Sequence, residues 1–286
     1  MDSVDLQATA PLWSCPFCQQ GLSFDAAAKS WSCQNRHSFD CAKETYVNLL
    51  PSNKKRSAQP GDNLEMITAR RRIHTAEIYR PLAEAVQAEV AALESVTRIL
   101  DLGCGEGYYS NALKHTRPGA QVCGVDISRS AIRLAARQYP EVNFAVASTF
   151  QLPVPTNSQD VLVRIFAPSD DDEAIRVLKA GGYYLEVTPA PRHLWALREA
   201  LYDTPRARES ANREIPRMQL LQSSTIAFEL ELDQPLLRDL VAMTPFAHRG
   251  HREKRQRLLT RKSQLVEMVF SVQLFQIEIT TGQGGQ

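Results

Sequence analysis

The chain has 286 residues, of which 43% are hydrophobic, enough to bury one sizeable core and to carry a small appended module. Its formal net charge is +1, which excludes a protein that is basic throughout, so a nucleic-acid-binding surface would have to gather its basic side chains on one face. The sequence contains no run of about 18 apolar residues and no basic N-terminal segment followed by an apolar stretch, so we expect neither a membrane span nor a secretory signal.

Three of the six cysteines, Cys15, Cys18 and Cys33, lie close together in the sequence and near His37. Cys15 and Cys18 are spaced as one metal-binding knuckle, and Cys33 with His37 is spaced as a second. Three thiolates and one imidazole suit a tetrahedral structural Zn²⁺ site with no open position. Unligated core cysteines beside a chance histidine are the alternative, and Cys41 could replace His37. The pattern suits a metal site in a reducing compartment, so we expect a cytoplasmic protein.

A polar, basic segment with two prolines and a glycine, residues 51–63, predicts a linker after this module. We therefore expect a zinc-binding module over residues 1–50, a basic linker over 51–63 and a larger domain over 64–286. The basic run Lys54–Arg56 could contact phosphates, because it joins the two units. A solvated surface is the alternative for this run and for the second basic run, Arg70–Arg72.

Asp62 as N-cap, with Glu65 at the capping-box position, predicts a helix over 64–74, and a second helix is expected over 81–93. Apolar runs and helical segments then alternate. We expect strands over 97–103, 120–127, 143–148, 160–166 and 182–188, and helices over 108–115, 128–139 and 170–179. This alternation predicts a parallel sheet covered on both faces. Residues 263–279 suit an antiparallel strand or hairpin at a sheet edge, whereas 190–260 give no clear pattern.

The first of these strands ends in a glycine-rich turn, ILDLGCGEGYYS. Gly103, Gly105 and Gly107 allow the backbone to approach a ligand closely and to adopt conformations that a Cβ would forbid. The form D-x-G-x-G-x-G, which begins at Asp101, resembles motif I of class I methyltransferases more than the loop of dinucleotide enzymes. Asp126 ends the second strand, where a carboxylate can accept both ribose hydroxyls. The turn therefore predicts S-adenosylmethionine binding, and a structural turn in another α/β domain is the alternative.

Other candidate site residues are less specific. Ser148 closes the third strand, where its hydroxyl could bond the adenine edge, or it could be only a polar strand end. His193 follows a strand C-terminus, where ligands bind in such sheets, although a surface helix start is the alternative. Tyr79 and Tyr109 could line a pocket or belong to the core. The two remaining cysteines, Cys104 and Cys123, are expected to be packing residues.

Five stretches are distinctive when taken together. They are CQNRHSFDCAKETYVNLL (33–50), KKRSAQPGDNLEMITARR (54–71), LDLGCGEGYYS (100–110), VRIFAP (163–168) and TPAPRHL (188–194). In this order they resemble the RlmA family of bacterial 23S rRNA guanine-N1 methyltransferases, over most of the chain. The resemblance implies a class I methyltransferase: a Rossmann-like α/β domain with a mainly parallel seven-stranded sheet, preceded by a zinc-binding module.

The resemblance also implies which residues bind the cofactor and the metal. Zn²⁺ would be held by Cys15, Cys18, Cys33 and His37, and S-adenosylmethionine would contact Tyr79, Tyr109, Ser110 and His193, with Asp126 as the ribose-binding carboxylate. A homodimer whose zinc modules help to form an RNA-binding cleft is implied, and position 745 of the RNA is favoured over 748. One departure is Ser169 and the acidic run after it, where a shorter and less acidic segment is expected.

Methyl transfer to guanine N1 requires this nitrogen to lose its proton while charge develops at O6, so a general base and a donor are expected. The sequence does not identify the base. Residues 188–194 and Arg164 are candidate surroundings of the guanine. Because N1 lies on the Watson–Crick edge, a paired guanine has to be unpaired first. A small-molecule methyltransferase with a zinc lid and a non-catalytic ribosome-assembly factor remain alternatives, although the intact glycine-rich turn argues against the latter.

Overall fold

The computed structural model describes residues 11–51, 61–207, 213–244, 246 and 251–278. The strands are β1 (Ser23–Asp25), β2 (Ser30–Ser32), β3 (Ser38–Asp40), β4 (Val47–Asn48), β5 (Arg98–Leu102), β6 (Gln121–Asp126), β7 (Asn143–Val146), β8 (Gln159–Ile165), β9 (Leu178–Pro189), β10 (Met218–Asp233) and β11 (Ser263–Ile277). The helices are α1 (Leu64–Thr75), α2 (Arg80–Ala92), α3 (Tyr108–Thr116), α4 (Arg129–Gln138), α5 (Asp171–Val177), α6 (Trp195–Leu201), α7 (Gln234–Ala242) and α8 (Arg252–Leu259).

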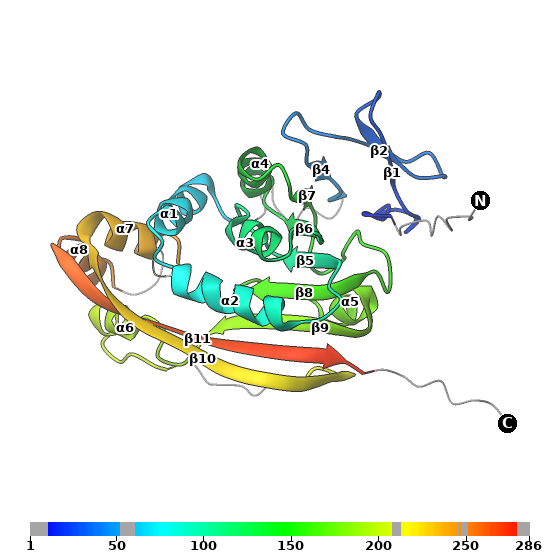
Figure 1. Ribbon diagram of the computed structural model, residues 1–286. Coiled ribbons are helices and arrows are strands. Elements are labelled where there is room, and N and C mark those ends of the chain that lie inside the picture. The colour runs from blue at the N-terminus through cyan, green and yellow to red at the C-terminus, as the bar shows by residue number, and fades with distance from the viewer. Residues whose placement is uncertain (1–10, 52–60, 208–212, 245, 247–250, 279–286) are drawn as a thin grey trace.

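The main sheet has eight strands in the order β10-β11-β9-β8-β5-β6-β7-β4 (Figure 1). Pairing is parallel from β9 to β4, and β11 adds to β9 in the antiparallel sense. This arrangement confirms the class I α/β fold and the antiparallel C-terminal strand. The sheet contains one strand more than expected, because β4, from the N-terminal module, pairs with β7 through Val47 and Asn48.

Different elements cover the two faces of the sheet. On one face, α2, α3 and α4 bury residues such as Val86, Leu113 and Ile132 in one apolar cluster. On the other face, Trp13 of the N-terminal module packs in a second cluster with Leu100 and with residues of α5. Figure 1 shows the module at one end of the molecule and the long β10–β11 pair along the opposite edge of the sheet. Both faces of the central strands are thus buried, as their apolar sequences require.

The helix at the start of the larger domain differs from the expectation in its cap. Asn63, not Asp62, caps α1, because its side chain accepts a hydrogen bond from the Met66 backbone N–H at 2.9 Å. The carboxylate of Asp62 is instead ion-paired with Arg70. The boundaries of α1 and α2 otherwise lie within two residues of those predicted.

The region 190–260, which the sequence left unassigned, contributes the edge strand β10 and helices α6, α7 and α8. The described part of β10 pairs along its length with β11, with an irregularity between Leu220 and Gln222. Within the described residues, no helix is both long and apolar enough to cross a membrane.

Candidate functional site

The glycine-rich turn between β5 and α3 adopts the left-handed conformations expected of it. Gly103, Gly105 and Gly107 have φ angles of 70°, 56° and 85°. A Cβ on Gly103 would overlap the Cβ of Ala167, and one on Gly107 would lie 2.9 Å from the Phe144 ring. A side chain at either position is therefore excluded by packing as well as by backbone conformation.

Asp126, at the end of β6, holds this turn in place. Its Oδ2 accepts a hydrogen bond from the Gly105 N–H at 3.0 Å, and its Oδ1 accepts one from the Ser128 N–H at 2.7 Å. A carboxylate has about four acceptor positions, so these two bonds leave room for hydroxyl donors. Burial raises the pKa of Asp126, and the two backbone donors oppose that rise. The arrangement fits a carboxylate that receives the hydroxyls of a ribose.

Asp101 and Ser110 form a second buried pair behind the turn. The Ser110 hydroxyl donates to Asp101 Oδ2 at 2.6 Å, and both side chains are almost fully buried. Burial raises the pKa of Asp101 to about 7, although the Ser110 hydrogen bond acts in the opposite direction. The pair thus joins the end of β5 to the first turn of α3.

Three of the predicted cofactor residues are buried aromatic side chains around the turn. The hydroxyl of Tyr109 is buried and has no hydrogen-bond partner among the described residues, which fits a site that receives a polar ligand group. Tyr79 is buried beside Phe270 at a centroid distance of 5.7 Å, and His193 lies against the same ring at 4.6 Å. His193 Nδ1 accepts from the Val269 N–H at 3.2 Å, so the neutral imidazole carries its proton on Nε2.

Ser148 lies just beyond β7, half-buried, where its Oγ accepts a hydrogen bond from the Phe150 N–H at 3.2 Å. The contact stabilises the turn that follows the strand. The hydroxyl proton of Ser148 is not used by this contact. A role toward an adenine edge therefore stays a prediction.

A polar cluster beside the glycine-rich turn was not predicted from the sequence. Arg70 and His74 lie one helical turn apart on α1, and Glu106 lies in the turn itself. His74 Nδ1 bonds Glu106, and the His74 ring stacks on Tyr108 at 4.1 Å. Burial raises the pKa of Glu106, but the bond from His74 and the charges of His74 and Arg70 outweigh it and lower the pKa. The i, i+4 spacing of Arg70 and His74 was the available signal.

Arg164 is placed differently from the expectation that it lies near the target guanine. Its side chain is buried and ion-paired with Glu186, its partner across the β8–β9 register. Along β8 it alternates with Val163, which faces the same side of the sheet as the α2–α4 helices, so Arg164 faces the opposite side. Arg213 joins this network through Glu186 and Asp171. The contacts of Arg164 thus indicate a structural role.

The segment that departs from the expected family pattern, Ser169 and the acidic run after it, makes contacts within the chain next to Arg164. Asp170 caps α5 by accepting from the Glu173 N–H at 3.1 Å, and Ser169 Oγ accepts from Arg164 at 2.9 Å. Asp171 pairs with Arg213. Asp170 and Asp171 are therefore engaged in intramolecular contacts.

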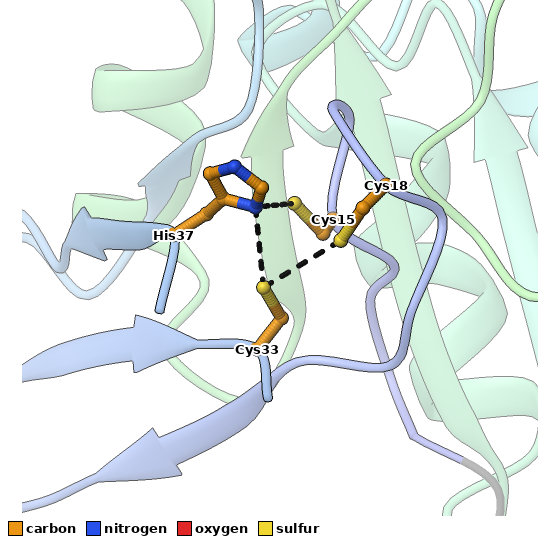
Figure 2. A group of neighbouring side chains, drawn as sticks. All are labelled: Cys15, Cys18, Cys33 and His37. Carbon is orange, nitrogen blue, oxygen red and sulfur yellow. Dashed lines mark hydrogen bonds between the residues drawn. The ribbon is translucent and has the colours of Figure 1, made fainter. Parts of the chain in front are cut away.

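The four predicted metal ligands meet in the N-terminal module (Figure 2). Their ligand atoms lie within 4.8 Å of one another in one cluster: Cys15, Cys18, Cys33 and His37. Cys18 Sγ lies 3.6 Å from Cys33 Sγ, and His37 Nδ1 lies 3.4 Å from Cys33 Sγ and 3.5 Å from Cys15 Sγ. Tetrahedral Zn²⁺ with Zn–S bonds near 2.3 Å places its sulfur ligands roughly 3.8 Å apart. The set therefore fits zinc, with Nδ1 as the imidazole ligand.

Turns in the backbone bring the two knuckles into position. Gln19 donates to the Cys15 carbonyl at 2.8 Å and Arg36 to the Cys33 carbonyl at 2.9 Å, and both donor residues have positive φ angles. Cys41 lies outside the cluster and bridges to Val47. His37 is thus the fourth member.

The two remaining cysteines, Cys104 and Cys123, are buried. Burial raises the pKa of both thiols, that of Cys123 to about 12, which agrees with the prediction that they are packing residues.

The structure describes only one of the two basic runs that could contact phosphates. Lys54–Arg56 lies outside the described residues. In the second run, Arg70 is ion-paired with Asp62, and Arg72 Nε donates to Asp239 Oδ2 at 2.6 Å. Two members of that run are thus committed to ion pairs within the chain.

Comparison with known proteins gives matches in both parts of the chain. Residues 13–58 match the family model described as RlmA, N-terminal, and residues 99–182 match that described as Methyltransferase domain. A putative 23S rRNA (guanine-N(1)-)-methyltransferase of Micromonospora griseorubida is 33% identical over 83% of this chain and 87% of its own.

Two further relatives cover a similar share of the chain. The putative 23S rRNA (guanine-N(1)-)-methyltransferase YxjB of Bacillus subtilis is 32% identical over 88% of this chain and 92% of its own. The 23S rRNA (guanine(748)-N(1))-methyltransferase of Streptomyces fradiae is 30% identical over 81% of this chain and 84% of its own.

Proposed function

Because the chain belongs to the RlmA family of 23S rRNA guanine-N1 methyltransferases, we propose that it transfers a methyl group from S-adenosylmethionine to N1 of a guanosine in 23S rRNA. It is an S-adenosylmethionine-dependent methyltransferase with a zinc-binding N-terminal module. The observation that carries the RNA assignment is the union, in one chain, of this RlmA-type module with a cofactor site at the glycine-rich turn.

The bound cofactor supplies an electrophilic methyl group on a sulfonium centre. We assign Asp126 to the ribose hydroxyls, because its carboxylate faces the turn with acceptor positions unused. The hydroxyl of Tyr109, which has no hydrogen-bond partner among the described residues, and the ring of His193 are assigned to contacts around the site. Tyr79 forms an apolar wall, Asp101 and Ser110 support the turn from below, and Ser148 lies near the adenine end. The turn, through Gly103 and Gly105, lets the backbone approach the ligand closely.

The chain's remaining task is to present guanine N1 to the methyl group. Alignment of the two reacting atoms supplies much of the rate acceleration in such a transfer. N1 also has to lose its proton to a base as the new bond forms. Because a paired guanine hides N1, the enzyme has to hold the base unpaired, which requires contacts with the surrounding RNA loop.

An aromatic row on the zinc module supports an RNA-binding role for it. Phe24, Trp31 and Phe39 are direct cross-strand partners on β1, β2 and β3, so their side chains share one face. Phe17 stacks on Phe39 at a centroid distance of 6.0 Å and an interplanar angle of 14°. Phe17 is 60% exposed and Phe24 48% exposed. Exposed aromatic rings on a small sheet are suited to stacking on unpaired bases.

Charge on the same small sheet is arranged to favour this use. Asp25 and Asp40 neighbour Phe24 and Phe39 along their strands, so strand alternation directs both acidic side chains to the opposite face. The aromatic face is thereby kept free of the strands' own carboxylates. We propose that Lys54–Arg56, which follows the module, contacts RNA phosphates.

Three further parts of the proposal come from the sequence: the homodimer from family resemblance, the location from the cysteine pattern, and the division of the chain from its composition. We propose that the enzyme acts as a homodimer, that it works in the cytoplasm, where ribosomal RNA is modified, and that the division into residues 1–50, 51–63 and 64–286 reflects its functional parts. We also propose position 745 as the target, with position 748, named for the Streptomyces fradiae relative, as the competing site.

Reverse transcription of treated 23S rRNA tests the proposal and the position together. N1 methylation blocks base pairing, so the enzyme with S-adenosylmethionine should create a single stop at one guanosine. A stop at 748 would correct the position and retain the activity. Methylation of small molecules without a stop in the RNA would replace the proposal with a small-molecule methyltransferase.

A further inference from the structure

Phe166, the residue directly after β8, combines a costly backbone conformation with an exposed ring. Its φ angle is 58°, in the left-handed region that a bulky side chain seldom adopts. Its backbone N–H donates to the Val187 carbonyl at 3.1 Å, which fixes this conformation. Nevertheless, 41% of the residue remains exposed. Strained residues that the surrounding structure holds in place occur preferentially at functional sites.

The ring lies against two aromatic residues of the proposed cofactor site, Tyr79 and Phe270. Its centroid is 6.2 Å from that of Tyr79, with the rings edge to face, and 5.5 Å from that of Phe270. The next residue, Ala167, fills the space that a Cβ on Gly103 would need. Phe270 in turn contacts His193. Phe166 is therefore the exposed member of an otherwise buried aromatic cluster beside the site.

We propose that Phe166 holds the target guanine by stacking its exposed ring on the unpaired base. The inference rests on the proposed function and names the residue that positions the base for it. A guanine withdrawn from its helix loses its stacking partners, and enzymes that act on such bases replace them with aromatic or apolar side chains. The exposed face of Phe166, at the C-terminal end of a central strand, is placed to do this.

The competing role for Phe166 is packing against Tyr79 and Phe270, which would support the cofactor site and nothing more. Phe166→Gly separates the two roles, because glycine adopts the observed φ without strain while removing the ring. If the ring serves the substrate, this variant should remain folded at the assay temperature and bind S-adenosylmethionine within about twofold of the wild type. Its kcat/KM for the RNA should fall by about 30-fold or more, the scale of one lost base–aromatic stack.

Two comparison variants sharpen the test. Phe166→Tyr keeps the ring and should retain most of the activity. Leu220→Ala removes a side chain of the same 41% exposure on the edge strand β10, and it should leave kcat/KM unchanged.

An RNA hairpin with 2-aminopurine at the methylated position gives a direct readout of stacking. The probe should fluoresce more brightly when bound to Phe166→Gly than to the wild type, because stacking quenches it.

The proposal is overturned if Phe166→Gly methylates the RNA normally, or if its activity falls only in proportion to losses of melting temperature and cofactor affinity. Equal brightness of the bound probe in both proteins would overturn it as well. Wild-type enzyme that binds S-adenosylmethionine but never methylates the RNA would contradict the proposed function itself, a result distinguishable from failure of the Phe166 variants alone.

Discussion

The Asp126 carboxylate lies 3.0 Å from the Gly105 backbone nitrogen and accepts its hydrogen bond, so the end of β6 is tied to the glycine-rich turn after β5. Its other oxygen accepts from the Ser128 N–H at the start of the next helix. One side chain thus fixes the turn and faces the place assigned to the ribose.

Asp126→Ala should weaken S-adenosylmethionine binding by about 100-fold or more, since hydrogen bonds to a charged group contribute roughly 1.5–3 kcal/mol each. Titration calorimetry measures the effect. Asp126→Asn keeps one acceptor oxygen and should lose less, and Asp25→Ala, an exposed carboxylate of the zinc module, should bind normally. Wild-type affinity in Asp126→Ala would show that the ribose is held elsewhere.

Gly103→Ala should destabilise the protein and abolish cofactor binding. The new Cβ would overlap Ala167 at a φ angle of 70°, and overpacking of this kind costs about 1–3 kcal/mol. Gly119→Ala is the matched control, because a Cβ there meets nothing within 4 Å. Denaturant unfolding and cofactor titration of both variants give the comparison. Equal stability of the two variants would mean that the turn relaxes more easily than its contacts indicate.

Cys18→Ser should lower the zinc content measured by mass spectrometry and expose the N-terminal module to proteolysis, because the module's small core depends on the metal. Cys41→Ser is its control, since Cys41 lies in the same module but outside the ligand cluster. Zinc should remain in Cys41→Ser. The opposite result, zinc kept by Cys18→Ser and lost by Cys41→Ser, would show that Cys41 rather than Cys18 binds the metal.

Asp101→Asn should change how stability depends on pH in the cofactor-free enzyme. Burial raises the folded-state pKa of Asp101 from 3.8 to about 7. The protonated folded form is therefore favoured, and ionising Asp101 progressively destabilises the fold as pH rises from about 4 to about 7. The variant removes this cost while its amide oxygen can still accept from Ser110.

Chemical denaturation at several pH values measures this difference. Relative to the wild type, Asp101→Asn should gain stability between pH 4 and 7 by an amount of order a few kcal/mol and then level off. Other titrating groups are common to both proteins and cancel. If the free energies of unfolding of the two proteins changed in parallel with pH, ionisation of Asp101 would not destabilise the fold.

The sequence was most informative where function depends on short-range spacing. The glycine-rich turn and the two zinc knuckles each span only a few residues, and each contains its own backbone turns. The alternation of strands and helices gave the central sheet for the same reason. His37 also emerged as the fourth ligand over Cys41, in agreement with the knuckle spacing.

Features that depend on contacts distant in sequence were missed. The two-residue strand β4 pairs with the edge that β7 offers it. The edge strand β10 was not predicted, although Ile226, Phe228, Leu230 and Leu232 alternate with exposed residues along its second half. The ion pair between Asp62 and Arg70 displaced the expected cap to Asn63. The burial of Arg164 was not predicted, because its partner, Glu186, lies on the neighbouring strand.

The conformation of Phe166 also depends on contacts with residues distant in sequence. The sequence VRIFAP does not predict a positive φ angle at the phenylalanine. That conformation goes with the hydrogen bond to Val187 and with the approach of Ala167 to Gly103. The segment was identified as the end of a strand over 160–166 and as part of a family resemblance. Its candidate role comes from three-dimensional placement.

Nucleoside analysis of 23S rRNA after reaction with isotopically labelled S-adenosylmethionine tests the central claim most directly. We predict close to one labelled 1-methylguanosine per RNA molecule with the wild-type enzyme and almost none with Asp126→Ala. Label on any other nucleoside, or no label despite measurable cofactor binding, would contradict the assignment of this chain as a guanine-N1 methyltransferase of 23S rRNA.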